Sequence, residues 1–182
     1  MDRLRVATVW LGGCAGCHMS FLDLDEFLVE LAAKIDLVYS PVIDTKVFPE
    51  GVDLCLVEGA VCNEDNLELI RHIRQRTKTV VSFGDCAATA NVPAIRNQLG
   101  LSSVESVLQR AYIDCAQTNP SIPREPGIVP ALLKRVLPVH EVVHVDHFLP
   151  GCPPPADRIK SLLTQVLNGE VPKLEGAQLK FG

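Results

Sequence analysis

Short apolar runs alternate with helix-like segments along this sequence, and this alternation restricts the fold more than any other feature. Five runs have the length and apolar character of buried strands. The run Leu54–Val57 contains no polar side chain, which is typical of a strand covered on both faces. Strands that alternate with helices predict a parallel sheet with right-handed crossovers. The strands are expected at Val6–Leu11, Asp36–Tyr39, Leu54–Val57, Thr79–Phe83 and Val142–Val145.

The segments between these runs have the apolar spacing of helices. Asn63 is the predicted N-cap of one helix, because acidic residues follow it and basic residues stand near the end of the segment. This pattern favours an α/β fold with a flavodoxin-like parallel sheet flanked by helices. We expect one domain over residues 1–170 and a C-terminal tail over residues 171–182. The helices are expected at Ser20–Ile35, from Asn63 to about Arg76, at Val104–Tyr112 and at Ala156–Leu167, with an irregular stretch over about 91–130.

The composition excludes several classes of protein. The 182 residues are 47% hydrophobic and 21% charged, which provides enough apolar material for a core. The net charge is -5 and Lys and Arg do not cluster, so nothing indicates binding to nucleic acid. No apolar run approaches the roughly 20 residues of a membrane helix, and the N-terminus shows no leader pattern. These features predict a cytoplasmic protein without direct membrane insertion, unless the chain is exported bound to another subunit.

Four of the seven cysteines follow predicted strands. Cys14 and Cys17 follow the first strand, Cys86 follows the fourth and Cys152 follows the fifth. An odd number of cysteines in a cytoplasmic chain argues against a disulfide framework. Because parallel strands end at the same edge of a sheet, we expect these four thiols to meet at the carboxyl edge.

Three interpretations of these thiols are open from the residues alone. A structural zinc site usually takes its ligands from two short knuckles, whereas a [4Fe–4S] cluster accepts one ligand at each corner and suits the long separations found here. A redox dithiol formed by Cys14 and Cys17, as in a stand-alone thiol or flavin oxidoreductase, leaves Cys86 and Cys152 without a role. The cluster is therefore the preferred interpretation, and the other two remain alternatives.

Three further side chains are expected beside the four thiols. Glu58 ends the third strand at the same edge, Asp85 precedes Cys86, and His18 follows Cys17. A carboxylate there can relay protons, serve as an oxygen ligand or bind backbone N–H groups. The His18 imidazole can donate to a cluster or shuttle protons, and the alternative is that it caps the helix start or faces solvent. The remaining cysteines are Cys55, expected as a small core residue, Cys62, considered as an accessory ligand, and Cys115, expected to lie outside the site.

Four stretches carry a specific resemblance: WLGGCAGCHMSFLD, EGAV, GDCAATANVPAIRN and LPGCPPPADRI. Together they resemble the small subunit of [NiFe]-hydrogenases, most of all the short small subunit of cytoplasmic NAD-reducing (bidirectional) enzymes. The resemblance implies a proximal [4Fe–4S] cluster held by Cys14, Cys17, Cys86 and Cys152. It implies a separate large subunit that carries the Ni–Fe centre and packs over the cluster edge. It also implies a diaphorase module with FMN and iron–sulfur clusters that passes electrons to NAD(P)+.

The resemblance therefore describes an electron-transfer subunit of a hydrogen:NAD+ oxidoreductase that has no catalytic site of its own. Larger members of the family carry two more clusters in a C-terminal domain, but no cysteine follows Cys152, so one cluster is expected. FMN on the flavodoxin-like fold is considered as an additional cofactor, although the sequence has no specific flavin motif. The cluster subunit of respiratory complex I is the nearest alternative; that family has adjacent cysteines near the first ligand position, and Cys14 and Cys17 are not adjacent.

Overall fold

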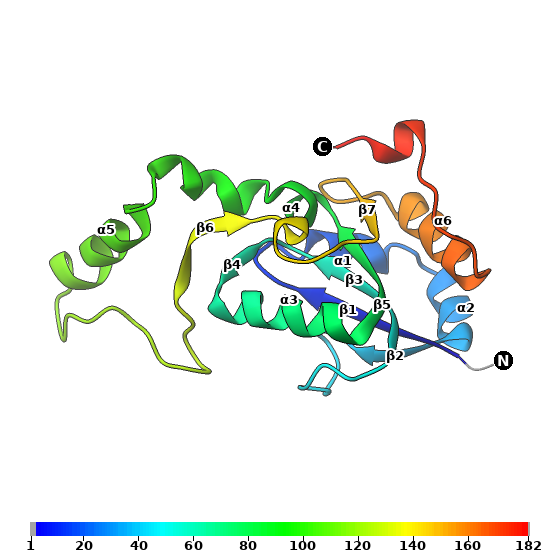
Figure 1. The fold of residues 1–182 in the computed structure, drawn as a ribbon, viewed down its shortest axis with the longest axis horizontal. Helices are drawn as coiled ribbons and strands as arrows, with labels where there is room; N and C mark the ends of the chain where they lie inside the picture. Colours follow the sequence, from blue (N-terminus) through cyan, green and yellow to red (C-terminus); the bar gives the residue numbers. More distant parts are fainter. Residues whose placement is uncertain (1–2, 182) are drawn as a thin grey trace.

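A parallel sheet forms the centre of the computed structural model, which describes residues 3–181 (Figure 1). Its strands are β1 (Leu4–Trp10), β2 (Ile35–Tyr39), β3 (Val52–Glu58), β5 (Thr77–Phe83) and β7 (His147–Leu149). They lie in the order β2-β1-β3-β5-β7, and every neighbouring pair is parallel. This is the flavodoxin-like strand order, so the predicted α/β class is confirmed.

Helices cover both faces of this sheet, and each face has its own core (Figure 1). The helices are α1 (Gly16–Leu22), α2 (Phe27–Lys34), α3 (Glu64–Arg76), α4 (Asp85–Thr89), α5 (Ser103–Gln109) and α6 (Ala156–Leu167). Leu54 and Leu56 of β3 pack with α1, α2 and α6, whereas Cys55 and Val57 pack with α3 on the opposite face. All four are fully buried, and each buried Leu or Val side chain contributes about 1.5–3 kcal/mol. Two-sided burial explains why this stretch of β3 is apolar throughout.

The predicted helix Ser20–Ile35 is wrong as a single element. The structure divides it into α1, which ends at Leu22, and α2, which begins at Phe27. Between them Asp25 takes a left-handed backbone conformation with φ of 47°. Asp favours such a break because its short carboxylate competes for local backbone hydrogen bonds and tolerates this region. The apolar spacing continues across the break because Leu24 is buried in the same core.

The predicted fifth strand at Val142–Val145 is misplaced. The last strand of the sheet is β7, which begins two residues later. Val142 and Val143 follow the short 3-10 helix η3 (Val139–Glu141) and pack against the core on the α3 face. This apolar run is explained by burial against the core and not by pairing in the sheet.

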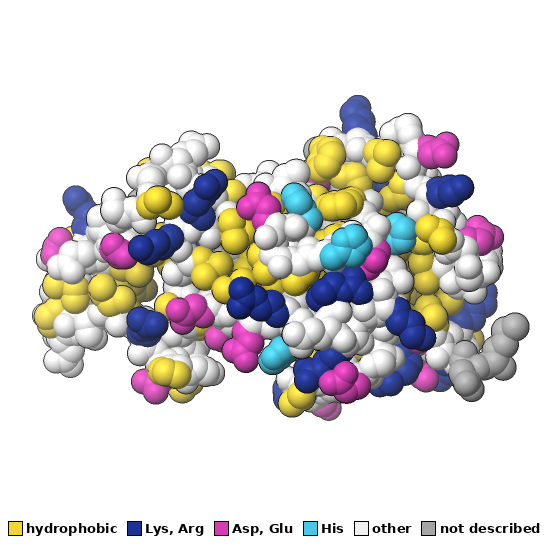
Figure 2. All heavy atoms as spheres, in the orientation of Figure 1, with side chains coloured by type: hydrophobic (Ala, Val, Ile, Leu, Met, Phe, Trp, Pro, Cys, Tyr) yellow, Lys and Arg dark blue, Asp and Glu magenta, His cyan; other side chains and the backbone are white. Residues whose placement is uncertain are grey.

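An arm projects from the sheet between β5 and β7, at the left of Figure 1. It contains the 3-10 helix η1 (Val92–Leu99), α5 and the π turn η2 (Arg110–Asp114), so the predicted helix at Val104–Tyr112 is confirmed as α5 extended by one π turn. The arm returns through β6 (Leu132–Leu137), which pairs antiparallel with β4 (Val61–Asn63) in a second sheet that the sequence did not indicate. Figure 2 shows hydrophobic side chains at the surface of this arm.

The last residues of the described chain pack along α6. Arg158 of α6 donates hydrogen bonds of 3.0 Å to the carbonyl of Ala177, within the 3-10 helix η4 (Gly176–Leu179), and to that of Lys180, directly after it. Leu174 packs against the core that α6 covers. Within residues 3–181 no helix combines the length and the apolar character needed to cross a membrane.

Candidate metal centre

The four predicted cysteines lie at the carboxyl edge of the sheet, in the loops and helix starts that follow β1, β5 and β7. Their thiols are close enough to interact electrostatically. The pKa of the Cys17 thiol is raised, and burial is the largest cause. Negative charge on Glu58, Cys86, Cys14 and Cys152 would raise it further. A positively charged metal centre at this edge would stabilise the thiolate forms of these cysteines.

The turn between β1 and α1 presents Cys14 and Cys17. Gly12 exchanges two backbone hydrogen bonds with Ala60, of 2.9 and 2.8 Å, which ties the turn to the segment after β3. Ala15 then takes a left-handed conformation with φ of 65° and starts α1. As a result Cys14 is exposed, whereas Cys17 in the first turn of α1 is only 7% exposed. The N–H of Gly16 donates to the Cys14 sulfur at 3.4 Å.

Cys86 is the second residue of α4, which follows the turn that ends β5. Burial raises the pKa of this thiol to about 11, with Cys152 and Cys14 adding to the shift and the Val92 N–H opposing it. The turn itself is formed by Gly84, whose N–H donates to the carbonyl of Leu149 at 2.8 Å. The loop after β5 is therefore joined to the end of β7.

Cys152 follows β7 and is exposed, with its sulfur accepting a hydrogen bond from the Asn91 side-chain amide at 3.6 Å. Its loop is fixed from the other side by Ser20 of α1, whose hydroxyl donates to the carbonyl of Pro154 at 2.6 Å. Sequence reasoning missed Asn91 and Ser20, because both contacts join residues far apart in the chain. The one available signal was that both lie close in sequence to a predicted cysteine.

The three side chains expected beside the thiols all lie at this edge. Glu58 is 1% exposed and accepts hydrogen bonds from the backbone N–H groups of Cys17, at 3.3 Å, and His18, at 3.0 Å. Its Oε2 also contacts Nδ1 of the His18 ring. Asp85 is 5% exposed and accepts a hydrogen bond of 2.6 Å from the N–H of Gly151.

The structure assigns the other three cysteines to different surroundings. Cys55 is fully buried in the core on the α3 face, as expected. Cys62 packs with the small cluster around Ala60 and lies under the turn of Gly12, where an added Cβ would come within 2.1 Å of the Cys62 sulfur. The pKa of Cys62 is raised by burial and lowered by Arg96, so its environment differs from that of the four edge thiols. Cys115 is exposed and follows η2 on the arm.

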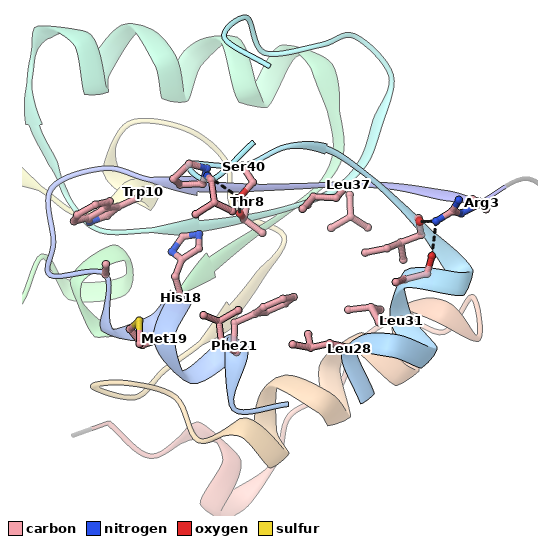
Figure 3. A pocket seen from close by; sticks show the side chains of 17 residues that line it. Arg3, Thr8, Trp10, His18, Met19, Phe21, Leu28, Leu31, Leu37 and Ser40 are labelled. Atoms are coloured by element: carbon pink, nitrogen blue, oxygen red, sulfur yellow. Dashed lines mark hydrogen bonds between the residues drawn. The ribbon is translucent and has the colours of Figure 1, made fainter. Parts of the chain in front are cut away.

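An apolar pocket of about 500 Å³ adjoins the edge, between β1, β2 and the helices α1 and α2 (Figure 3). His18 points into it from α1, and its Nε2 is buried without a hydrogen-bond partner among the described residues. Thr8 and Ser40 form a hydroxyl pair at 3.1 Å in its wall. Arg3 is the one guanidinium or ammonium among the described lining residues, and it is bound to backbone carbonyls and to Asp36.

The residues at the edge fit an iron–sulfur cluster. The donor set is four thiols from three loops, and a Cβ on Gly16 would lie 3.2 Å from the Cys14 sulfur, so backbone approaches the thiols closely. No three His, Cys, Asp or Glu side chains of residues 3–181 are arranged around a single metal ion. Arg3 is paired with Asp36 and is the one cation among the described lining residues of the apolar pocket.

Comparison with a protein-family model gives a match over residues 14–166 to the family described as NADH ubiquinone oxidoreductase, 20 kDa subunit. The chain belongs to this family. The match begins at the first edge cysteine and ends in α6, so it includes all four cysteines of the site.

Individual proteins that are similar to this chain are hydrogenase subunits. The chain is 40% identical over 171 residues to the delta subunit of the NAD-reducing hydrogenase HoxS of Cupriavidus necator, covering 92% of this chain and 80% of that protein. It is 39% identical to a subunit of the F420-non-reducing hydrogenase vhu of Methanocaldococcus jannaschii, covering 94% of this chain but 58% of that longer protein. The chain is thus homologous to subunits of hydrogenase complexes.

Solved structures agree with this relationship. A chain of a crystal structure of NAD+-reducing [NiFe]-hydrogenase in the H2-reduced state superposes with a TM-score of 0.89 and 39% identity, covering all of both chains. A chain of the [NiFeSe]-hydrogenase from Dm. baculatum superposes with a TM-score of 0.62, covering 98% of this chain and 69% of the hydrogenase chain. At 19% identity the second likeness concerns the fold alone.

Proposed function

We propose that this chain is the electron-transfer small subunit of a cytoplasmic NAD(P)-linked [NiFe]-hydrogenase. In this proposal Cys14, Cys17, Cys86 and Cys152 hold one [4Fe–4S] cluster. The observation that carries the proposal is the gathering of these four thiols at one sheet edge in a chain homologous to the HoxS delta subunit. The chain acts within an oxidoreductase complex and supplies no catalytic residue of its own.

The cluster, when bound, accepts and donates single electrons at a potential set by its thiolates and their surroundings. The chain's contribution is to hold the four thiols on a rigid sheet and to exclude water from part of the site. Cys17 is nearly buried, and the N–H of Gly16 and the amide of Asn91 donate to cysteine sulfurs. Such donors stabilise negative charge on sulfur and thereby tune a cluster.

The proposed partners follow from the homologous complexes. A large subunit with the Ni–Fe centre would pack over the cluster edge, and a diaphorase with FMN and iron–sulfur clusters would carry electrons on to NAD(P)+. The NAD-reducing enzymes among the relatives support this assignment. Exposed apolar side chains next to the edge, including Trp10 and Met19, are consistent with a surface that a partner covers. FMN on this chain stays an expectation from the flavodoxin-like fold and is not part of the proposal.

A second candidate is a cluster subunit of a complex I-like oxidoreductase, and the name of the matching family favours it. In both candidates the chain holds one cluster and passes electrons between partners. The metals of the complex distinguish them, because only a hydrogenase brings nickel with the large subunit.

The deciding experiment is metal analysis of the complex purified without oxygen through a tag on this chain. We expect about four irons and four acid-labile sulfides to stay with this chain when it is separated from its partners without oxygen, as a [4Fe–4S] cluster requires, with nickel in the co-purified partner. One zinc and no sulfide would overturn the electron-transfer function in favour of a structural zinc site. Iron and sulfide without nickel would favour the complex I-like candidate.

Cysteine variants test the ligand set in the same complex. Cys86→Ser and Cys152→Ser should lower the iron content and sharply reduce hydrogen-dependent reduction of NAD(P)+, while diaphorase activity with artificial donors persists. Cys115→Ser is the matched control, because Cys115 is exposed on the arm. Cys62→Ser tests the accessory ligand, and we expect it to keep the full cluster. A complete cluster in Cys86→Ser would refute the assignment.

A further inference from the structure

The first turn of α1 lacks a cap from its own sequence neighbours. Its N-cap residue is Ala15, which has no side chain able to accept a hydrogen bond. The N–H groups of Cys17 and His18 are instead accepted by the two carboxylate oxygens of Glu58, at 3.3 and 3.0 Å. Glu58 is the last residue of β3, so a neighbouring strand supplies the cap of the helix that begins with the cysteine turn.

A second buried carboxylate makes an equivalent connection on the other side of the edge. Asp85 accepts the N–H of Gly151 at 2.6 Å through its side chain, and its own N–H donates to the Gly151 carbonyl at 3.0 Å. Asp85 precedes Cys86 and Gly151 precedes Cys152. Two hydrogen bonds therefore join the loops that carry these two cysteines.

We propose that Glu58 and Asp85 are positioning residues that set the relative placement of the four thiols. Glu58 holds the turn of Cys14 and Cys17 against the end of β3, and Asp85 holds the loop of Cys152 against that of Cys86. This inference rests on the proposed function, because it concerns the shape in which the thiols receive a cluster.

The local sequence shows why such connections are needed. The turn from Gly12 to Gly16 contains three glycines, and Gly151 precedes Cys152, so the backbone of these loops has many accessible conformations. Covalent geometry alone does not fix a thiol in such a loop. Both carboxylates are nearly inaccessible to water and accept hydrogen bonds from the loop backbone, which is an arrangement that restricts each loop to one conformation.

The test compares two carboxylates at opposite ends of β3. Glu58→Gln removes one acceptor at the thiol edge. Asp53→Asn is the matched control, because Asp53 lies in the same strand and accepts the Arg5 N–H at 2.9 Å, at the end remote from the cysteines. Both variants are purified as the whole complex without oxygen. The measurements are iron content, the electron paramagnetic resonance spectrum, the midpoint potential of the cluster and its rate of iron loss to a chelator.

We expect Glu58→Gln to change the resonance spectrum, to shift the midpoint potential because the hydrogen bonding of the first turn of α1 changes, and to release iron about tenfold faster, the factor expected for losing one hydrogen bond. Asp53→Asn should match the wild type in all three. Asp85→Asn should also release iron faster, and this variant decides the matter if Glu58→Gln fails to accumulate.

The outcomes separate this inference from the function on which it rests. A wild-type complex with a cluster, together with Glu58→Gln and Asp85→Asn variants that match Asp53→Asn in spectrum, potential and iron loss, would overturn the positioning role alone. A wild-type chain without iron and sulfide would overturn the proposed function, and the positioning role with it.

Discussion

The backbone of Gly84 packs directly against the thiol of Cys17, so closely that a Cβ on Gly84 would lie 2.2 Å from the sulfur. Gly84 also has φ of +84°, a left-handed conformation that side chains disfavour. The turn after β5 and the first turn of α1 can therefore pack this closely only because Gly84 has no side chain.

Gly84→Ala is expected to displace Cys17 and to prevent full cluster assembly. Gly100→Ala is the matched control, because Gly100 has a similar φ of +91° but an added Cβ there meets nothing within 4 Å. Both variants should lose roughly 1–2 kcal/mol through backbone strain, and only Gly84→Ala should lose iron as well. Thermal unfolding and iron analysis measure the two effects separately. Equal iron contents in the two variants would contradict the expectation.

Ser20→Ala is expected to loosen the Cys152 loop. The Ser20 hydroxyl is buried and donates to the Pro154 carbonyl at 2.6 Å, so the variant leaves a buried acceptor without its partner. A cost of about 1–3 kcal/mol follows, measurable as a lower urea midpoint. Ser20→Thr, which keeps the hydroxyl, is the companion variant. Identical midpoints for Ser20→Ala and the wild type would show that this hydrogen bond does not support the loop.

Asn63→Ala is expected to weaken α3 by about 1 kcal/mol. The Asn63 side chain accepts the N–H of Asn66 at 2.8 Å, and this bond caps the helix. Ser102 precedes α5 but makes no side-chain cap bond, so Ser102→Ala should change stability much less. The free energy of unfolding in urea compares the two variants, and a larger loss in Ser102→Ala would be the contrary result.

Asp146 is expected to make stability depend on pH. Burial alone would raise the pKa of its carboxyl, but the Val80 N–H and the Arg74 guanidinium outweigh burial and lower it. A lowered pKa in the folded state means that the contribution is complete above the unfolded value of about 4 and is lost as pH falls through the lower folded value. Asp146→Asn should therefore cost about 1–2 kcal/mol at pH 7, and the difference from wild type should shrink below about pH 4.

Asp36→Asn is the control for this pH dependence. Asp36 pairs with Arg3 at 3.1 Å, but both side chains are half exposed, and such surface pairs contribute little. Denaturant unfolding at pH 7 and at pH 3 measures both variants. A constant difference between Asp146→Asn and the wild type across this range would contradict the assigned role of the ionised carboxylate.

The sheet and the place of the site could be predicted because their signals are local. Leu54–Val57 is apolar throughout, and Cys14, Cys86 and the acidic Glu58 each stand at or just after the end of a strand. Strand direction then determines which edge these residues share. A single sequence is enough to identify this shared edge, because the inference uses neither interatomic distances nor the identity of contacting residues.

The features that escaped prediction depend on contacts between distant parts of the chain. β4 has three residues and pairs with β6, which follows the long arm, so no local pattern reveals it. Val142 and Val143 pack against the core on the α3 face. The apolar pattern of the sequence alone does not distinguish such a packed loop from a strand of the sheet. Asn91 and Ser20 reach the Cys152 loop through the fold.

The edge thiols are distributed over nearly the whole chain, from the turn after the first strand to the loop after the last. β7 is a short strand at the border of the sheet, and it pairs with β5 only after the intervening arm has been closed into a long loop. Contacts of such high sequence separation cost loop-closure entropy and slow folding. A growing polypeptide therefore has an incomplete set of thiols until the segment with Cys152 has been synthesised, and the four thiols share one edge only once β7 has paired with β5.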